Sequence, residues 1–172
     1  DQIIIVNATS LSIDERTSFK TQLETDQNIS NTSLCSTPPG ETLFTFGVTL
    51  PGNSGDEDKR LVFYQLFVDE NFLTTMGISL KEGRYFSERI SADSLTSFVI
   101  NEAGAKAIGK NPISQQIETP NIYTGTRAIK NVVGVISDFH FSSFHSAVEP
   151  LILEFSPKYA GYVLIRFNPT NT

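Results

Sequence analysis

The chain has 172 residues, of which 39% are hydrophobic and 10% aromatic, so it contains enough apolar material to fold as one domain or as two small lobes that share a core. This composition excludes disorder as a description of the whole chain. Its 19 acidic side chains outnumber its 13 basic ones, and the net charge is −6. With no cluster of lysines and arginines, the chain is not expected to have nucleic acid or an anionic membrane surface as its main partner.

The first third of the sequence predicts a β-α-β unit. A short β-branched run at residues 3–6 is typical of a buried strand. Ser12 and Glu15 have the spacing of a capping box, which predicts a helix over residues 13–25. Residues 29–36 alternate loosely and predict a second strand. The expected inward contacts of the helix are Ile13, Phe19 and Leu23.

The next segment predicts two strands and a short helix. Residues 43–50 and 61–68 are rich in β-branched and aromatic side chains, and the charged stretch between them is expected to be a loop. Asp69 is predicted to cap a short helix that ends at Met76. Gly77 then follows as its left-handed terminator.

A strand-turn pattern leads into a further strand and helix. Residues 78–86 are expected to be extended, with a turn at Glu82 and Gly83. Gly83 is expected to need a backbone conformation that β-branched residues avoid. Residues 97–100 predict a short strand. Asn101 is expected to cap a helix over residues 102–108, where a following glycine stops it.

The last third consists mainly of predicted strands. Residues 116–135 are expected to hold a hairpin with its turn near residues 121–125, and its second strand should include the apolar run 129–136. Residues 150–155 and 162–167 are two further strand candidates. Several strands with about three short helices place the chain in the α+β class.

One stretch matches the start of a phosphate-binding loop. Gly104, Gly109 and Lys110 have the spacing Gly-x-x-x-x-Gly-Lys and follow a predicted strand. A phosphate loop launches its helix at the Gly-Lys, whereas here Asn101 launches one before the first glycine and Pro112 prevents its continuation. The two glycines are therefore interpreted as a helix interior and a helix stop.

The two histidines suggest a metal site, and a metal-dependent hydrolase built on them is one alternative function. His140 and His145 lie near Asp138 and Glu149 in sequence. Their separation of five residues turns them about 140° apart on a helix and onto opposite faces of a strand. Only a loop could bring them together, so a packed or hydrogen-bonded pair is the preferred interpretation.

The remaining reactive groups have structural interpretations. Cys35 allows no internal disulfide and has no histidine near it in sequence, so it is interpreted as a small, half-buried residue. The pairs Asp14 with Glu15 and Asp69 with Glu70 fall at predicted helix starts, where the helix dipole favours negative charge. We therefore expect no catalytic, cofactor-binding or metal-binding residue, and no cofactor.

Three stretches, taken in order, resemble a known family. Residues 68–86 carry a strand, an Asp, an aromatic residue, a short helix, Gly-Ile and Gly-Arg-Tyr-Phe, which is similar to the MacB-like periplasmic core domain. Residues 97–109 resemble the strand and helix that follow in that family. Residues 132–150 contain Val-Gly-Val-Ile-Ser-Asp-Phe-His-Phe, which resembles the form found in Bacteroidetes permeases.

The resemblance implies an extracytoplasmic domain of an FtsX/MacB-type ABC transporter permease in the inner membrane. It implies a porter-like lobe at residues 1–42 and 144–172, and a sabre-like lobe at residues 43–143. ATP would be hydrolysed by a separate cytoplasmic subunit, and the domain would transmit movement for export or for handling a substrate outside the membrane. The implied partners are that ATPase, a second permease copy and periplasmic proteins or lipoproteins; docking of an adaptor protein is left open because this insert is shorter than that of the macrolide exporter.

The chain is expected to be a fragment of such a permease. No aliphatic run approaches the roughly 20 residues of a membrane-spanning helix, and we expect such segments before and after this sequence in its gene. Both ends should then lie on one side of the domain. A ligand-binding or sensor domain is the alternative, and it predicts a defined cavity for a small molecule.

Overall fold

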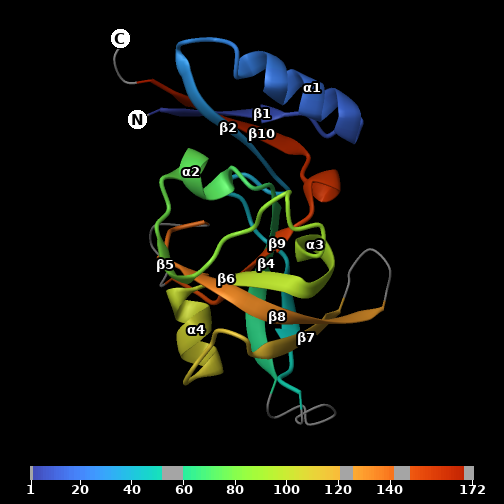
Figure 1. Cartoon of the computed structure of the whole chain (residues 1–172), viewed down its shortest axis with the longest axis vertical. Coiled ribbons are helices and arrows are strands. Elements are labelled where there is room, and N and C mark those ends of the chain that lie inside the picture. Colours follow the sequence, from blue (N-terminus) through green and yellow to red (C-terminus); the bar gives the residue numbers. More distant parts are fainter. Residues whose placement is uncertain (1, 52–59, 121–125, 142–147, 169–172) are drawn as a thin grey trace.

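The computed structural model describes residues 2–51, 60–120, 126–141 and 148–168, and within these ranges strands predominate over short helices (Figure 1). The strands are β1 (Ile3–Asn7), β2 (Ile29–Cys35), β3 (Thr45–Val48), β4 (Leu61–Val68), β5 (Leu80–Gly83), β6 (Ser97–Asn101), β7 (Gln116–Pro120), β8 (Arg127–Ile136), β9 (Leu151–Phe155) and β10 (Tyr162–Phe167). The helices are α1 (Ile13–Leu23), α2 (Phe72–Met76), α3 (Asp93–Thr96), α4 (Glu102–Ile108) and the 3-10 helix η2 (Pro157–Tyr159). This mixture confirms the α+β class.

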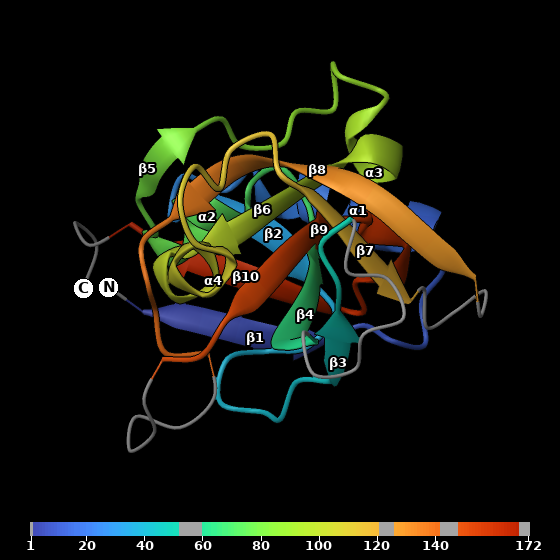
Figure 2. The same ribbon diagram turned by 90° about the horizontal axis from the view of Figure 1, so that it is seen from below.

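Six of the strands close into a ring, which we call the barrel (Figures 1 and 2). The order around it is β3, β4, β9, β6, β8 and β7, with parallel pairing between β4 and β9 and between β6 and β8. A two-way backbone bridge closes the ring, because Thr49 N donates to Glu118 O at 3.1 Å and Glu118 N donates to Thr49 O at 2.9 Å. Closure removes the open sheet edges that these strands would otherwise expose.

The barrel interior is apolar along most of its length. Alternate residues of its strands point inward, and they form one buried cluster: Phe46, Val48, Phe63, Phe98, Ile100, Ile117, Val132, Val135 and Ile152. On three of the strands the same inward positions continue with Gln65, Lys130 and Glu154, which are also buried. Polar side chains therefore close one end of an apolar barrel.

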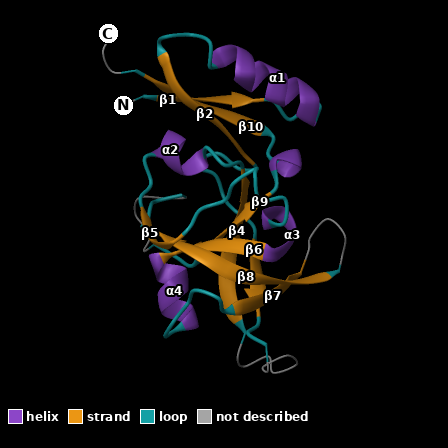
Figure 3. Ribbon diagram, viewed as in Figure 1, coloured by secondary structure: helices purple, strands orange, loops and turns teal. Residues whose placement is uncertain are grey.

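The remaining chain ends build a second, smaller sheet, which we call the terminal sheet. It consists of β1, β10 and β2, with β10 antiparallel to both neighbours. The predicted β-α-β unit is thus present, but β10 from the far end of the chain lies between its two strands. Helix α1 covers the face of this sheet that points away from the barrel (Figure 3). As predicted, its inward contacts include Ile13, Phe19 and Leu23.

A second apolar layer fills the space between the terminal sheet and the outer wall of the barrel. It combines barrel residues such as Leu66 and Leu153 with Leu164 of β10 and Phe72 of α2. Phe86, Phe139 and Phe141 are part of the same packing. Large aromatic side chains supply most of the buried area in such layers, so this layer stabilises the contact between the two sheets.

Most predicted elements are present, with shifted ends. The capping box of Ser12 and Glu15 is complete, and Asn101 and Gly77 cap α4 and α2 as predicted.

Helix α1 ends at Leu23 instead of residue 25, because Thr25 N already bonds to Gln22 O in a tighter turn. Strand β3 is shorter than predicted, since Thr49 leaves β4 to bridge the barrel. The turn expected near residues 121–125 lies outside the described residues.

Two short helices, α3 and η2, were not predicted. Each has four residues or fewer, too few to show a helical hydrophobic period. The prediction for Asp69 was wrong: Asn71 is the N-cap of α2, without a side-chain cap bond, and Asp69 instead accepts from Asn71 N at 3.1 Å in a turn before the helix. Glu70 likewise accepts from Glu88 N at 2.9 Å.

The described ends of the chain lie side by side, as predicted. Phe167 N donates to Gln2 O at 3.3 Å, next to the pairing of Ile3 with Arg166, and both ends lie on the same side in Figures 1 and 2. No helix in the described part of the chain is long and apolar enough to cross a membrane.

Candidate functional site

The terminal sheet and the barrel meet at a narrow backbone connection, which we call the joint. Strand β2 pairs with β4 through one register position, Cys35 opposite Val68. Two further backbone bonds flank it, from Ser36 N to Phe67 O at 2.9 Å and from Asp69 N to Leu34 O at 3.3 Å. So few ladder bonds cannot by themselves fix the orientation of two sheets, and side chains must supply the remaining contacts.

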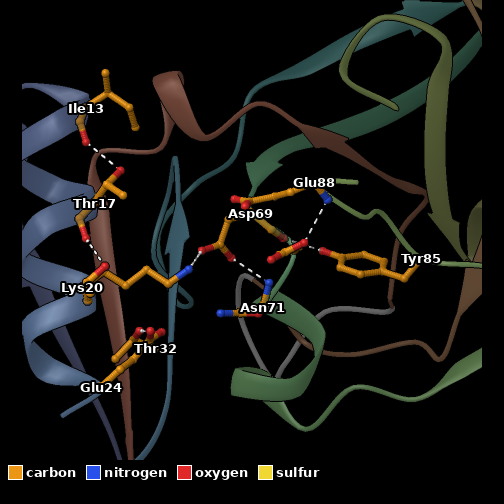
Figure 4. Close-up of polar contacts among 11 residues, drawn as sticks. Ile13, Thr17, Lys20, Glu24, Thr32, Asp69, Asn71, Tyr85 and Glu88 are labelled. Atoms are coloured by element: carbon orange, nitrogen blue, oxygen red, sulfur yellow. Dashed lines mark hydrogen bonds and ion pairs between the residues drawn. The ribbon is translucent and has the colours of Figure 1, made fainter. Parts of the chain in front are cut away.

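A buried ion pair spans the joint (Figure 4). Lys20 extends from α1 across the end of the terminal sheet, and its Nζ lies 2.6 Å from Asp69 Oδ2 at the end of β4. The Asp69 side chain is 2% exposed and that of Lys20 14%. Removing one partner of such a pair leaves an uncompensated charge in the protein interior, which typically costs about 3–5 kcal/mol.

The surroundings of Asp69 disfavour the charged form of its carboxyl. Burial raises the pKa of its carboxyl, and Lys20 and the backbone N–H groups offset only part of the rise. Tyr85 donates its hydroxyl proton to the backbone oxygen of Asp69 at 3.1 Å (Figure 4). Burial, followed by the nearby Asp69 carboxylate, raises the pKa of Tyr85 well above its ordinary value, so this hydroxyl remains a hydrogen-bond donor at neutral pH.

Two arginines, one on the terminal sheet and one on α1, reinforce the joint. Arg166 of β10 donates from Nη1 to the carbonyl oxygens of Thr75 at 3.0 Å and Thr74 at 3.3 Å, at the C-terminal end of α2. A cation is favoured there because the last carbonyls of a helix have no helical partner. Arg16 of α1 donates from Nη2 to Lys158 O in η2 at 3.1 Å. The terminal sheet is therefore held at two places besides Asp69.

Cys35 lies within the joint and is an unreactive thiol. Its side chain is fully buried, and burial, followed by the charge of Asp69, raises its pKa to about 12. A thiol with that pKa is almost entirely protonated at neutral pH and is a poor nucleophile and metal ligand. Its structural interpretation is thus supported, although the residue is fully buried where the sequence predicted half-burial.

A cleft of about 470 Å³ lies beside the joint, between α3 and η2. Leu95, Ala128, Phe155, Pro157 and Tyr159 contribute its apolar walls, and Lys130 and Glu154 lie at its floor. Lys130 Nζ bonds to Glu154 Oε1 at 2.5 Å and to Ser94 O at 2.8 Å.

The charges at the floor of this cleft are already paired. Gln65 Nε2 occupies the other carboxylate oxygen of Glu154 at 2.7 Å, and Lys130 Nζ also lies 5.0 Å from the ring centre of Phe98. The charges of Lys130 and Glu154 are therefore paired, whereas the buried amide oxygen of Gln65 has no hydrogen-bond partner within the ranges that the structure describes. These three side chains close the end of the barrel.

The motifs considered in the sequence occupy structural positions. Gly104 lies inside α4 and Gly109 ends it with φ of 100°, which confirms the structural interpretation of the phosphate-loop match. His140 is exposed, while His145 lies outside the described residues. Among the residues that the structure describes, no group of three His, Cys, Asp or Glu side chains is placed to hold a metal ion.

Sequence reasoning missed the charges that form the joint. Lys20 and Asp69 are 49 positions apart, and no local pattern links them. The sequence does indicate a buried, paired Lys130, because this residue interrupts an apolar strand on the face that otherwise points inward. An unpaired lysine is rarely tolerated at such a position. The arrangement fixes one sheet against the other through a few charged contacts that add to the apolar layer between them.

Comparison with known proteins gives structural matches. No family model matches the chain, and no curated protein matches its sequence. The periplasmic region of MacB from Actinobacillus actinomycetemcomitans is similar, with a TM-score of 0.63, 15% identity, and coverage of 99% of this chain and 76% of that one. A domain of a putative permease protein from Porphyromonas gingivalis has a TM-score of 0.56 and 14% identity, covering 86% and 66%.

A third match comes from Gram-positive bacteria. The extracellular domain of the noncanonic ABC-type transporter YknZ has a TM-score of 0.56 and 10% identity, covering 90% of this chain and 73% of that one. The chain therefore has the fold of the MacB-like periplasmic domain. This agrees with the family that the sequence motifs resemble.

Proposed function

We propose that this chain is the extracytoplasmic domain of an ABC transporter permease subunit of the FtsX/MacB type, with no reaction of its own. The observation that carries this proposal is the fold match to the periplasmic region of MacB over 99% of the chain. The motif resemblance at residues 68–86 and 132–150 supports it independently, because it rests on side chains rather than on backbone shape.

In this proposal the domain transmits movement. A separate cytoplasmic ATPase subunit hydrolyses ATP, and the permease conveys the resulting motion across the inner membrane to the periplasmic side. The adjacent chain ends suit this role, since the hydrogen bond between Phe167 and Gln2 puts both connections at one place on the domain. Movement applied there would reach the terminal sheet first and the barrel through the joint.

The lobes of the proposed domain are residues 1–42 with 144–172 and residues 43–143. The terminal sheet falls in the first group, and most of the barrel falls in the second. Strand β9 belongs to the first group by sequence but pairs with β4 and β6 in the barrel. It would therefore link the two lobes, because it continues along the chain toward β10 of the first lobe and is hydrogen-bonded to strands of the second.

The proposed partners are the ATPase, a second permease copy, and periplasmic proteins or lipoproteins outside the membrane. No nucleic acid partner is proposed, in keeping with the net charge of −6. The work of the complex would be export, or the handling of a substrate beyond the inner membrane.

The test uses the intact permease with its ATPase in lipid nanodiscs. Spin labels are placed on Lys106→Cys, an exposed position of α4, and the distance between the two copies is measured without nucleotide and with ATP and vanadate. The native cysteine is buried and does not compete for the label. We expect the label distances to change with nucleotide, and an ATPase-inactive complex to show no change.

A matched pair of arginine variants tests the role of the joint. Arg166→Gln removes the contact with α2, whereas Arg89→Gln changes an exposed arginine outside the joint. The first should reduce the nucleotide-dependent distance change while ATP hydrolysis continues, and the second should leave both unchanged. Identical label distances in all nucleotide states of the parent complex would contradict mechanical transmission.

A further inference from the structure

The two strands at the ends of the strand order, β1 and β5, each pair with one neighbour among the described residues, and their open edges are protected differently. Strand β5 carries Lys81 and Glu82 and a register irregularity against β8, all of which discourage pairing with another strand. Strand β1 reads Ile3-Ile-Ile-Val-Asn7 and contains no charge, proline or bulge. Native proteins rarely leave such an edge uncovered, because its free backbone groups form a template for another strand.

The side chains of β1 are exposed to an unusual degree for their type. Ile4 is 49% exposed and Ile5 41%, and Leu11 in the following turn is 36% exposed. Successive strand residues face opposite sides of a sheet, so Ile4 and Ile5 expose apolar surface on both faces at the same edge. A strand added alongside would cover both.

The free backbone groups of β1 can be assigned from its bonds to β10. Gln2 O accepts from Phe167 N at 3.3 Å, and Ala8 N donates to Gly161 O at 2.9 Å. Antiparallel ladders alternate between bonded and non-bonded positions, so the even-numbered residues bond to β10. The N–H and C=O groups of Ile3, Ile5 and Asn7 therefore point outward, and no other described strand pairs with them.

We propose that β1 pairs antiparallel with β1 of a second copy of this chain, about a two-fold axis at Ile5. In this register the outward groups of Ile5 face those of Ile5 in the second copy, and Ile3 faces Asn7. All five strand residues then have a partner, and the apolar Ile4 lies opposite Val6. Each bonded pair exchanges two N–H···O bonds.

At β1 a second copy meets little charge repulsion. Two chains of net charge −6 repel one another over most of their surfaces, whereas β1 offers an uncharged, self-complementary stretch. Two five-residue strands bury less than the roughly 1,200 Å² of a stable interface, so the isolated domain should associate weakly. The inference rests on the proposed function in one respect. In an intact permease with two copies, the two domains would be held at high local concentration, which would favour their pairing.

The first test is cysteine cross-linking of the purified 172-residue domain. Ile5→Cys places two thiols at the two-fold axis, where a bonded antiparallel pair has a Cα separation of about 5.5 Å, suitable for a disulfide. Mild oxidation with copper phenanthroline should give a covalent dimer. Val62→Cys is the control, since this β4 residue is also apolar and 60% exposed; it should cross-link at least tenfold more slowly.

The register is tested with a mixture of two single variants. Ile3→Cys and Asn7→Cys should each cross-link poorly with themselves but efficiently when mixed, because the proposed pairing brings residue 3 of one copy opposite residue 7 of the other. Equal cross-linking in every combination would contradict this register.

The second test removes one outward hydrogen bond. Ile5→Pro deletes an N–H that does not bond to β10, and proline is tolerated at such edge positions. In sedimentation velocity the parent domain should dimerise as its concentration rises to about 1 mM, and this variant should stay monomeric with unchanged circular dichroism. A parent domain that stays monomeric, with residue 5 cross-linking no faster than residue 62, overturns the proposal.

The outcomes separate this proposal from the proposed function. A monomeric domain that binds an unrelated, uncharged strand peptide would assign the edge to a different partner and overturn pairing between copies. It would leave untouched the nucleotide-dependent label distances, which test mechanical transmission. Conversely, a dimer with the predicted register would stand even if those distances did not change.

Discussion

In the barrel every strand has a partner on each side, whereas the terminal sheet ends at an open strand and meets the barrel at one register position. The barrel interior is filled by fully buried apolar side chains such as Phe63 and Ile152. The contact of the terminal sheet with the barrel adds one ion pair and two arginine-to-carbonyl contacts to its apolar layer. The barrel is therefore stabilised by its own apolar interior, whereas the orientation of the terminal sheet depends on a shared apolar layer and a few polar groups.

The largest expected effect is at the end of β5, where Gly83 pairs with Gly134 of β8 although the sequence predicted a turn there. Gly83 has φ of 72°, and a Cβ there would lie 2.2 Å from the backbone oxygen of Val133. Gly83→Val should therefore prevent folding or lower the free energy of unfolding by more than about 4 kcal/mol, a cost reserved for a few severe mechanisms. Thermal and urea unfolding would measure it.

The control for this prediction is a glycine in the loop that follows the terminal sheet. Gly40 also has positive φ, at 95°, but nothing lies within 4 Å of its Cβ position. Gly40→Val should carry only the conformational cost of about 1–2 kcal/mol. Equal effects of the two variants would show that the close contact at Gly83 is not the cause.

The next effect concerns the barrel interior. Phe63 is fully buried among the barrel cluster, and its neighbour Val62 is 60% exposed on the outer face. Phe63→Ala should lower the free energy of unfolding by about 3–5 kcal/mol through lost burial and a cavity. Val62→Ala should change it by less than about 0.5 kcal/mol. A loss below about 1 kcal/mol for Phe63→Ala would mean that the barrel collapses around the deletion.

A smaller effect is the pH dependence of stability, which should differ between an aspartate of the joint and an aspartate of α3. Burial raises the pKa of Asp69 in the joint. The contribution of this group to stability is therefore fully present at a pH below its pKa in the unfolded chain, near 3.9, and it declines as the pH rises through its pKa in the folded chain. Asp93 in α3 behaves oppositely: burial also acts to raise its pKa, but hydrogen bonds from Arg84 and Ser97 lower it overall. Its contribution is present above pH about 3.9 and is lost as the pH falls.

The two aspartates can be separated by urea unfolding between pH 2 and 8. Asp69→Asn should weaken the decline of stability above pH about 4, and Asp93→Asn should weaken the decline below it. Opposite assignments, or two variants with identical pH profiles, would contradict the environments inferred for these carboxyls.

The smallest expected effect is at the start of α1. Ser12 Oγ accepts from Glu15 N at 3.3 Å, and Glu15 Oε2 accepts from Ser12 N at 2.8 Å. Ser12→Ala should cost about 1 kcal/mol, as is typical for the loss of an N-cap. Ser12→Asp, which keeps an acceptor, should restore most of it. A helix start that tolerates alanine without loss would show that packing of α1 on the terminal sheet dominates its stability.

Local patterns in the sequence were sufficient for elements that depend on near neighbours. The capping box of Ser12 and Glu15, the cap at Asn101 and the left-handed Gly77 were all predicted because each involves groups within a few residues. Asp69 shows the limit of such reasoning. Its position before a helix favoured a cap, but its side chain bonds instead to Lys20 from a distant helix.

Hydrophobic period, caps and motifs are local properties, so the amino-acid sequence was enough to predict the α+β class, most strand positions and the resemblance to periplasmic domains of permeases. Three features became visible only in the folded chain: β10 lies between β1 and β2, Thr49 and Glu118 close the barrel, and Lys20 reaches Asp69. These contacts join residues far apart in the chain. Their formation depends on how the sheets pack together, which no single segment specifies.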